Sequence, residues 1–382
     1  MPRNILTVSH LYPSPAFPGL GTFVRDEVIE LARGNNVVVV APLRAAGGGP
    51  SVPSDVEEDG VRVVRPRFPG IPIGGRIVEP RLWATRLRPL LRGLYEEMDG
   101  DLVHAHFALP DGFAAARFSS RQSTPLVLTI RGSDVFVLGA RRIARGDLRR
   151  TLARTRAVIA VSDELAERAA WLGVPSEWIH VIPGGVPYRP REDRQEARSR
   201  LGVDEDALCI LWVGRLVSVK QPLDAIRAFA ALEASLPRRN AMLVMIGEGP
   251  LAAQVSQAVR HEGRDRVRLL GYQSREDVWT WQCASDLLLN SSRSEGTPIA
   301  VLEALGAGTP VVAYPLSGVR AVLAAVAGGT TALDSTPQAL AAAISIELEE
   351  ARDRTAVADR ARMRFDIARA CREVEDVYET VL

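Results

Sequence analysis

The chain has 382 residues, too many for one ordinary hydrophobic core, so we expect two domains of roughly 150–200 residues each. Its residues are 47% hydrophobic and 24% charged, as in soluble globular proteins. The formal net charge is +1, and the overall charge balance therefore gives no indication of a nucleic-acid partner.

Two further features concern the location of the protein. No stretch approaches the ~18 apolar residues of a membrane-spanning helix, and the first residues do not form a signal peptide. Cys209, Cys283 and Cys371 are far apart and form no CxxC pair, so neither a zinc site nor a disulfide framework is indicated. We expect a cytoplasmic protein.

Short apolar runs alternate with amphipathic segments along the whole chain, which is typical of βαβ units and parallel sheets. The strands expected in the first half are Ile5–Ser9, Val37–Ala41, Val61–Arg65, Leu102–His104, Leu126–Ile130, Ala157–Val161 and Ile179–Ile182. Those expected in the second half are Leu208–Val213, Met242–Ile246, Val267–Leu270, Asp286–Leu289 and Pro310–Ala313. The pattern predicts an α/β protein of two doubly wound domains, in which ligands bind beyond the carboxyl ends of the strands.

The alternation breaks between residues 183 and 200, where a Pro- and Gly-rich turn is followed by charged residues. We place an N-terminal domain at residues 1–188 and a C-terminal domain at residues 189–364. Residues 365–382 are helical in composition and contain no strand pattern. This last helix either caps the second domain or crosses back to the first.

The segment from Glu295 to Glu303 follows the strand that ends near Asn290. Thr297 is suited to cap a helix and Pro298 to occupy its first position, so free N–H groups there would form an anion site. Glu303 is a lone carboxylate in a helix that otherwise looks buried, and a vicinal diol would satisfy it. The equal alternative is that Glu303 pairs with an arginine in the core and Glu295 is an ordinary loop residue.

Only one of the 47 basic residues is a lysine, Lys220, and it follows the first strand of the second domain. Because every other basic residue is arginine, the retained lysine indicates a function. A compact ammonium fits against one phosphate where a guanidinium does not. Together with Arg215, Lys220 would stabilise the charge on a departing diphosphate. The alternative is a solvated surface loop.

These motifs resemble those of the large retaining glycosyltransferase family numbered 4. That family has the GT-B fold, in which two Rossmann-like domains face each other across a cleft. Glu295 to Glu303 matches its E-x7-E motif, and Arg215 with Lys220 matches its G-R-x4-K segment. Residues 183–186, 247–250 and 270–272 resemble its P-x-G-V, G-x-G-P and F-x-G segments, in family order. The resemblance covers essentially the whole chain.

The resemblance implies that the second domain binds a nucleotide-sugar donor. Arg215 and Lys220 would hold the diphosphate. Glu303 would bind the ribose hydroxyls and Glu295 those of the transferred sugar, with no metal or other cofactor. The implied donor-binding residues are Gly21, Gly214, Gly247, Tyr272, Gly296, Thr297, Pro298, Ile299 and Glu303.

The first domain would bind the acceptor. Gly21, in a G-x-F-V segment, would let the backbone approach the diphosphate. We expect His104 to point into the structure and His106, beyond the strand end, to reach the cleft. Two histidines on one face can suggest a metal, but we expect no carboxylate or cysteine nearby to complete a set. No metal is therefore predicted.

Arg131 occupies a position where many relatives of the family have a histidine. A permanent cation cannot be a general base, so His106, Asp134 or the donor phosphate would take the acceptor proton. The phosphate suits a front-side, retaining mechanism. Arg131 itself would bind an acidic group of a substrate or pair with Asp134. The predicted acceptor-side residues are His106, Arg131 and Asp134, and the predicted catalytic residues are Arg215, Lys220, Glu295 and His106.

Residues 62–92 contain eight arginines and one acidic residue, Glu79. Apolar residues recur there at helical spacing: Leu82, Trp83, Leu87, Leu90, Leu91 and Leu94. A basic amphipathic helix over Arg76–Leu94 predicts peripheral contact with a membrane. The alternative, which we favour, is an ordinary packed helix with a solvated arginine face.

We expect a retaining, metal-independent hexosyltransferase that moves a sugar from a UDP- or GDP-sugar to a hydroxyl of a glycan, a lipid-linked glycan or a small molecule. The motifs are most similar to those of enzymes that build cell-surface polysaccharides or glycolipids. The alternatives are a natural-product glycosyltransferase, then a GT-B-fold epimerase or phosphorylase, or a non-catalytic nucleotide-sugar-binding protein. We predict a cytoplasmic location. If the basic helix binds lipid, the protein would lie at the inner face of the membrane.

Overall fold

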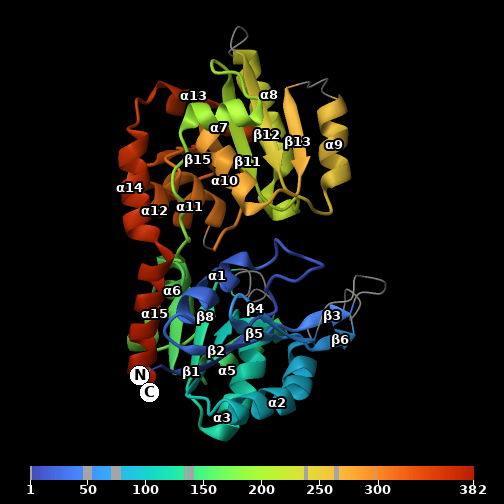
Figure 1. The fold of residues 1–382 in the computed structure, drawn as a ribbon, viewed down its shortest axis with the longest axis vertical. Coiled ribbons are helices and arrows are strands. Elements are labelled where there is room, and N and C mark those ends of the chain that lie inside the picture. The colour runs from blue at the N-terminus through green and yellow to red at the C-terminus, as the bar shows by residue number, and fades with distance from the viewer. Residues whose placement is uncertain are drawn as a thin grey trace. The chain divides into compact units, whose positions relative to one another are not determined.

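The computed structural model describes residues 2–45, 54–69, 79–132, 135, 142–235, 240–261, 266–296 and 298–382. The chain folds as two compact units, one formed by Met1–Pro187 with Ile367–Leu382 and the other by Tyr188–Asp366 (Figure 1). The sequence places the boundary between residues 188 and 189, one residue from this division. The last helix, α15 (Ile367–Val381), packs on the first unit.

The first unit is built on an eight-stranded sheet with the order β10-β9-β8-β7-β1-β2-β5-β4. Neighbouring strands are parallel except for the pair β4 and β5. The strands are β1 (Asn4–Val8), β2 (Asn36–Val40), β4 (Asp55–Glu58), β5 (Val61–Val64), β7 (Leu102–His106), β8 (Leu126–Ile130), β9 (Ala157–Ala160) and β10 (Ile179–Val181). β3 (Leu43–Ala45) and β6 (Arg67–Pro69) form a separate parallel pair.

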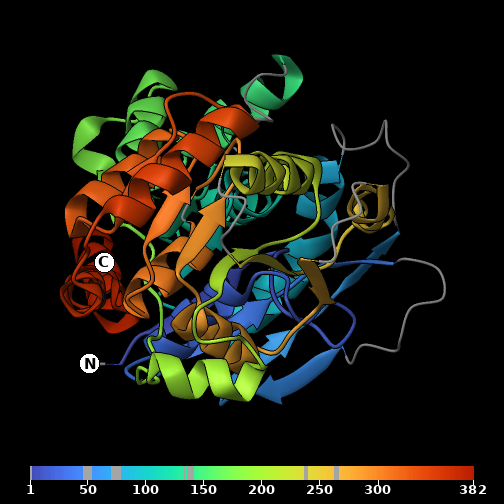
Figure 2. The same ribbon diagram turned by 90° about the horizontal axis from the view of Figure 1, so that it is seen from above.

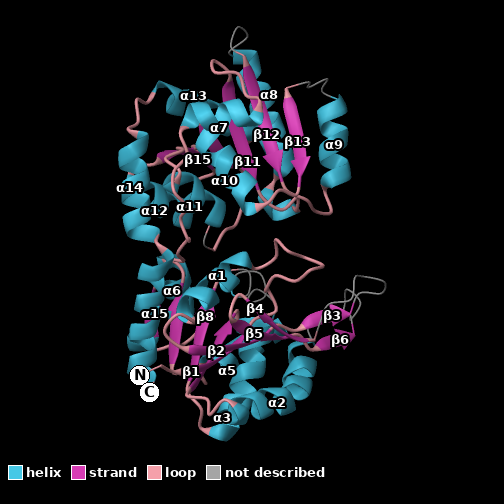
Figure 3. Ribbon diagram, viewed as in Figure 1, coloured by secondary structure: helices cyan, strands magenta, loops and turns pink. Residues whose placement is uncertain are grey.

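Helices cover both faces of this sheet, as Figure 3 shows. They are α1 (Thr22–Leu31), α2 (Glu79–Glu97), α3 (Phe113–Gln122), α5 (Arg142–Leu152), α6 (Asp163–Trp171) and α15. Successive residues of β1 point to opposite faces: Leu6 and Val8 pack with α2 and α3, whereas Ile5 packs with α1 and α15. Because both faces are buried, the strands read as continuous apolar runs.

The second unit has a six-stranded, fully parallel sheet with the order β13-β12-β11-β14-β15-β16. The strands are β11 (Leu208–Val213), β12 (Ala241–Ile246), β13 (Val267–Gly271), β14 (Leu287–Asn290), β15 (Val311–Ala313) and β16 (Gly329–Thr331). The helices are α7 (Arg194–Leu201), α8 (Pro222–Ser235), α9 (Ala252–His261), α10 (Arg275–Ala284), α11 (Ile299–Gly306), α12 (Ser317–Val326), α13 (Pro337–Glu349) and α14 (Arg354–Phe365). α8 and α13 pack together on one face, and α7 packs with α10 on the other (Figure 2).

Each sheet has one position at which the chain order reverses. In the first unit the chain runs from β1 out to β2 and then continues on the other side of β1 with β7. In the second unit it runs from β11 out to β12 and β13 and then continues on the other side of β11 with β14. Ligands of doubly wound sheets bind beyond the carboxyl ends of the strands at this reversal. The loops after β1, β7, β11 and β14 are therefore the expected functional loops.

The predicted α/β class, with a doubly wound parallel sheet in each half, is confirmed. All twelve predicted strands are present with ends shifted by at most two residues. The analysis of periodicity missed four short strands, β3, β4, β6 and β16. The Asp-Val-Glu-Glu sequence of β4 has no apolar run, because this antiparallel strand lies at the edge of its sheet.

Candidate functional site

A polar group of the second unit joins the loops after β11 and β14. Nζ of Lys220 lies 2.5 Å from Oε1 of Glu295, and Nδ2 of Asn290 lies 3.5 Å from the same oxygen. The Glu295 side chain is 9% exposed and that of Lys220 is 27% exposed. Because neither side chain is fully buried, a ligand can reach the pair from solvent. The alternative of a solvated loop for Lys220 does not fit this environment.

Hydrogen bonds to the backbone fix these two loops against each other. Ser291 Oγ, which accepts a hydrogen bond of 3.0 Å from Trp212 Nε1, also lies 2.8 Å from the carbonyl oxygen of Lys220. The N–H of Arg293 donates to the carbonyl oxygen of Val219 at 2.9 Å. The two loops that carry Lys220 and Glu295 are therefore held together by these hydrogen bonds as well as by the ion pair itself.

Two glycines allow the loops after β11 and β12 to pair closely. Gly247 has a φ of +138°, and a Cβ built on it would lie 1.9 Å from the carbonyl oxygen of Gly214. Only glycine fits there. Beside this contact, the N–H of Leu216 donates to the carbonyl oxygen of Glu248 at 2.8 Å. Arg215, between these bonded positions, has an exposed side chain that forms no ion pair with the described residues.

The helix α11 begins one residue later than predicted. Pro298 is its N-cap residue rather than its first helical residue, and its carbonyl oxygen accepts bonds from Val301 and Leu302. The N–H groups of Ile299 and Ala300 have no partner in the part of the chain that the structure describes. These two N–H groups are the donors that the predicted anion site would use, and the site itself stays a prediction. Gly296 precedes the helix, and Thr297 lies outside the described residues.

Glu303 is less isolated than its sequence context suggests. The helix around it is buried, but its own side chain is 18% exposed and its Oε1 lies 3.5 Å from Nη2 of Arg275. Its Oε2 lies 3.5 Å from Nε2 of Gln282. Of the two interpretations, the one in which Glu303 pairs with an arginine fits the structure, although this arginine, Arg275 of α10, is partly exposed rather than in the core. Two residues of α10 thus lie beside the Glu303 carboxylate.

The remaining predicted donor residue follows β13. Tyr272 is 50% exposed, and its backbone N–H lies 3.4 Å from Oε1 of Glu248. Because β11, β12, β13 and β14 are parallel, the loops that follow them lie at one edge of the sheet. Those loops carry Arg215 and Lys220, Gly247, Tyr272, and Glu295 with the start of α11. The structure thus brings the predicted donor residues of the second unit to a single edge.

In the first unit Gly21 is the N-cap residue of α1, with a φ of +76°. A Cβ there would lie 2.3 Å from the backbone of Leu11. This glycine is therefore required by packing within the first unit, whatever ligand it contacts. The N–H groups of Thr22 and Phe23 have no backbone partner among the described residues, as expected at a helix start.

His106 lies deeper than predicted. It is the last residue of β7 rather than a residue beyond the strand, and it is 0% exposed. Its ring lies against that of His104, with 4.4 Å between the centroids, because residues two apart in a strand share a face. Burial, with His104 and Arg131 nearby, lowers the pKa of His106 well below its usual value. The expectation that His106 reaches an open cleft is wrong.

His104 points inward as predicted and is held at both ring nitrogens. Its Nε2 lies 2.8 Å from Thr129 Oγ1, and its Nδ1 lies 2.7 Å from the hydroxyl of Tyr378 on α15. Burial lowers the pKa of His104 to about 3, so the ring is neutral at physiological pH.

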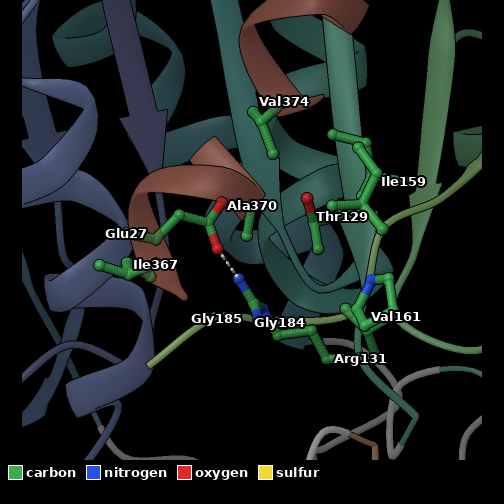
Figure 4. Close-up of a pocket in the computed structure, with 12 residues that line it drawn as sticks. Glu27, Thr129, Arg131, Ile159, Val161, Gly184, Gly185, Ile367, Ala370 and Val374 are labelled. Carbon is green, nitrogen blue, oxygen red and sulfur yellow. Dashed lines mark hydrogen bonds and ion pairs between the residues drawn. The ribbon is translucent and has the colours of Figure 1, made fainter. Parts of the chain in front are cut away.

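Arg131 is buried and pairs with Glu27 and His106. Its Nη2 lies 2.6 Å from Oε2 of Glu27 and 3.0 Å from Nδ1 of His106, as the close-up in Figure 4 shows for Glu27. Its guanidinium also covers the ring of Phe23. Asp134 lies outside the described residues. A small pocket beside the Arg131–Glu27 pair, lined partly by α15, has room for about one water molecule.

Glu27 is the functional-site neighbour that the sequence analysis missed. Its carboxylate lies with His104 and His106 in a buried group whose ligand atoms are within 4.8 Å of one another. The statement that no carboxylate completes such a set is therefore wrong. The group already includes the Arg131 cation, which a metal ion would have to displace. An available signal was the pair of acidic residues, Asp26 and Glu27, between Val24 and Val28 on the buried face of α1.

The apolar face of α2 is buried in the core of the first unit. Trp83, Leu87, Leu91 and Leu94 are each at most 5% exposed and pack in the cluster around β1 and β7. The arginines of α2 form an exposed face, as in the ordinary packed helix that we favoured. Residues 76–78 of the proposed membrane segment lie outside the described residues. None of the described helices is both long and apolar enough to cross a bilayer.

Comparisons with known proteins give a consistent result. The family described as "Glycosyltransferase Family 4" matches residues 18–189, and the family "Glycosyl transferases group 1" matches residues 193–364. The chain is 30% identical to the putative teichuronic acid biosynthesis glycosyltransferase TuaC of Bacillus subtilis, over 99% of this chain and 98% of that protein. It is 31% identical to the D-inositol 3-phosphate glycosyltransferase of Kineococcus radiotolerans, over 71% of this chain and 68% of that protein.

Among solved structures, the fold is similar to that of Anabaena Alr3699/HepE in complex with UDP and glucose. The TM-score is 0.74 at 20% identity, over 99% of this chain and 100% of that chain.

Proposed function

Because the chain belongs to glycosyltransferase family 4 and has its GT-B fold, we propose that it transfers a sugar from a UDP- or GDP-sugar to an acceptor hydroxyl with retention of configuration. The observation that carries this proposal is the set of groups at the carboxyl edge of the second sheet. There the Lys220–Glu295 pair, the exposed Arg215 and the free N–H groups of α11 offer charges and donors suited to a sugar diphosphate.

In this proposal residues 189–364 bind the donor. Arg215 and Lys220 hold the diphosphate and stabilise the charge that grows on it as it leaves. These two cations supply the positive charge that a metal ion supplies elsewhere, and we therefore propose a metal-independent reaction. Glu295, already bound to Lys220, accepts hydrogen bonds from hydroxyls of the transferred sugar.

The nucleoside would contact the helix α11 and the loop after β13. Glu303, whose side chain is 18% exposed, accepts hydrogen bonds from the ribose hydroxyls. The half-exposed ring of Tyr272 packs beside the base.

The first unit would bind the acceptor. The buried positions of His106 and Arg131 favour a structural role for both, which leaves Asp134 and the donor phosphate as the predicted proton acceptors. The similarity to TuaC supports an acceptor from cell-surface polysaccharide synthesis. The similarity to a D-inositol 3-phosphate glycosyltransferase keeps a small polyol phosphate as the second candidate.

The experiment that tests the proposed function is a thermal-shift screen against a panel of UDP- and GDP-sugars. A donor that binds the folded chain raises its Tm by mass action. Transfer from that donor is then measured with n-octyl glycosides and D-inositol 3-phosphate as acceptors, and the anomeric configuration of the product is read by NMR. No stabilisation by any nucleotide sugar would contradict the proposal.

A further inference from the structure

A buried carboxylate follows Lys220 closely in the chain. Asp224 is in the first turn of α8, four residues after Lys220, and is 4% exposed. Its backbone N–H donates to the carbonyl oxygen of Gln221 at 3.0 Å, and Ser291 Oγ, from the loop after β14, lies 3.0 Å from the same oxygen. Because a buried carboxylate is costly without polar partners, the partners of Asp224 indicate which parts of the chain it holds together.

The partners of the Asp224 carboxylate come from three elements. The hydroxyl of Tyr314, directly after β15, donates to Oδ2 at 3.0 Å. Nη1 of Arg227, one turn later in α8, donates to Oδ1 at 3.1 Å. Nη2 of Arg293, in the loop after β14, lies 3.6 Å from Oδ2. Asp224 therefore connects the start of α8, the end of β15 and the loop that carries Glu295.

Tyr314 is the fully buried partner, with 0% exposure. Burial and the neighbouring Asp224 carboxylate raise the pKa of its hydroxyl, which therefore keeps its proton and donates the hydrogen bond. The backbone N–H of Tyr314 donates to the carbonyl oxygen of Asn290 at 3.2 Å. Because Nδ2 of Asn290 lies 3.5 Å from Oε1 of Glu295, this contact leads from Asp224 to the proposed donor site.

Arg293 provides a second connection to the same site. It precedes Glu295 by two residues, and its backbone N–H donates to the carbonyl oxygen of Val219, next to Lys220, at 2.9 Å. Its guanidinium approaches Asp224, so the residue contacts the loop after β11 through its backbone and α8 through its side chain. The chain segments on both sides of the Lys220–Glu295 pair are thus attached to one buried carboxylate.

We propose that Asp224 is the positioning residue of the Lys220–Glu295 pair. This inference rests on the proposed function. Asp224 contacts neither the sugar nor the diphosphate, and it acts by holding the two loops where the ammonium faces the diphosphate and the Glu295 carboxylate faces the sugar. Fixed charges stabilise a transition state only from the correct place, and a displacement of about 1 Å is enough to lower a rate by up to about 100-fold. Donor affinity should change less, because Arg215 and the start of α11 keep their positions.

The test compares Asp224→Asn with a matched control, Glu347→Gln. Both variants remove the charge of a side chain in the second unit and nearly keep its shape, and both parent residues are 4% exposed. The Glu347 carboxylate is also bound by an arginine and a hydroxyl, those of Arg352 and Thr330, but these partners lie after α13 and on β16. Both variants are therefore expected to lower the Tm, while only Asp224→Asn alters the loops of the proposed donor site.

Transfer is measured roughly 15 °C below the lowest Tm, with the donor that stabilises the wild type. Asp224→Asn is expected to lower kcat about 10-fold or more with the calorimetric donor Kd within about 3-fold, and Glu347→Gln to stay within about 2-fold of the wild type in both. Tyr314→Phe removes one hydrogen bond to the carboxylate and no charge. It is expected to lower kcat about 3-fold or more, and it tests the same link if Asp224→Asn does not fold.

A double-variant cycle with Lys220→Ala separates positioning from a general loss of structure. In that background Asp224→Asn is expected to lower kcat by at most about 3-fold, because the ammonium that it positions is absent. An equal factor in the two backgrounds overturns the proposal, as does a wild-type kcat in Asp224→Asn or, where that variant does not fold, in Tyr314→Phe. A wild type that binds no nucleotide sugar overturns the proposed function instead.

Discussion

Lys220 and Glu295 are 75 residues apart in the sequence, yet Nζ of the lysine lies 2.5 Å from Oε1 of the glutamate. The pair is the point at which the loops after β11 and β14 meet, and backbone bonds through Ser291 hold both loops in place. We therefore expect that removal of either side chain changes the charge of the site and leaves the backbone of the two loops in place.

Lys220→Ala is expected to lower sugar transfer by about 100-fold or more, since a preorganised charge facing a leaving group typically contributes that much. Lys220→Arg should restore little, because the guanidinium fork is wider than an ammonium. Transfer from the stabilising donor measures both. Arg260→Ala, at an exposed arginine of α9, is the control and should be neutral. Wild-type rates in Lys220→Ala would contradict the donor-site assignment.

Glu303→Gln is expected to weaken donor binding about 10-fold while leaving kcat within a few-fold. The amide keeps the shape of the side chain and its approach to Gln282, but it lacks the charge that favours hydrogen bonds from ribose hydroxyls. Calorimetric titration with the donor measures the change. Unchanged affinity would mean that Glu303 serves only its contact with Arg275.

Gly247→Ala is expected to destabilise the second unit by more than about 3 kcal/mol. The new methyl would combine a φ of +138° with a 1.9 Å approach to the carbonyl oxygen of Gly214, so the loops after β11 and β12 must separate. Gly202→Ala is the matched control. It has a positive φ of +62° but nothing within 4 Å of the added atom, and should cost only about 1–2 kcal/mol. Urea denaturation of both variants gives the difference.

Single residues explain why part of the site could be predicted from the sequence and part could not. Lys220 and Glu295 follow apolar runs that are unmistakable strands, and parallel strands bring their following loops to one edge. The partner of His104 is Tyr378, 274 residues later, and the contact exists because α15 packs on the first sheet. No periodicity contains that information. The start of α11 was misplaced by one residue because the fit of proline to a first helical position does not exclude the N-cap.

The buried histidines predict an acid-sensitive fold. Burial lowers the pKa of His104 to about 3, and that of His106 also falls well below its usual value of about 6.5. The unfolded chain thus binds protons that the folded chain does not. Above pH ~6.5 neither ring lowers the free energy of unfolding. Below that pH each ring lowers it by up to about 1.4 kcal/mol per pH unit, and for His104 the decline continues to about pH 3.

Urea denaturation at pH 7.0 and roughly pH 5 tests this prediction. His106→Asn keeps an acceptor toward Arg131 but does not titrate, so it should lose less stability between the two pH values than the wild type. The difference isolates His106, because the carboxylates of both proteins titrate alike. An equal loss in the two proteins would show that His106 is already protonated or accessible in the folded state.

The Arg131–Glu27 pair is expected to contribute to the fold as a unit. Each side chain is at most 11% exposed, and the two approach to 2.6 Å. Arg131→Met leaves the carboxylate of Glu27 buried without this cation, and Glu27→Gln removes the Glu27 charge from the buried guanidinium, so each single variant should lose about 3–5 kcal/mol. The double variant buries neither charge, so its loss of stability should be smaller than the sum of the two single losses by about 1–3 kcal/mol.

The surface pair Arg25–Asp59 provides the comparison. Its side chains are 32% and 43% exposed, so the coupling energy between them should stay under about 1 kcal/mol. Strictly additive losses at Arg131 and Glu27 would mean that solvent or a third group already neutralises each charge.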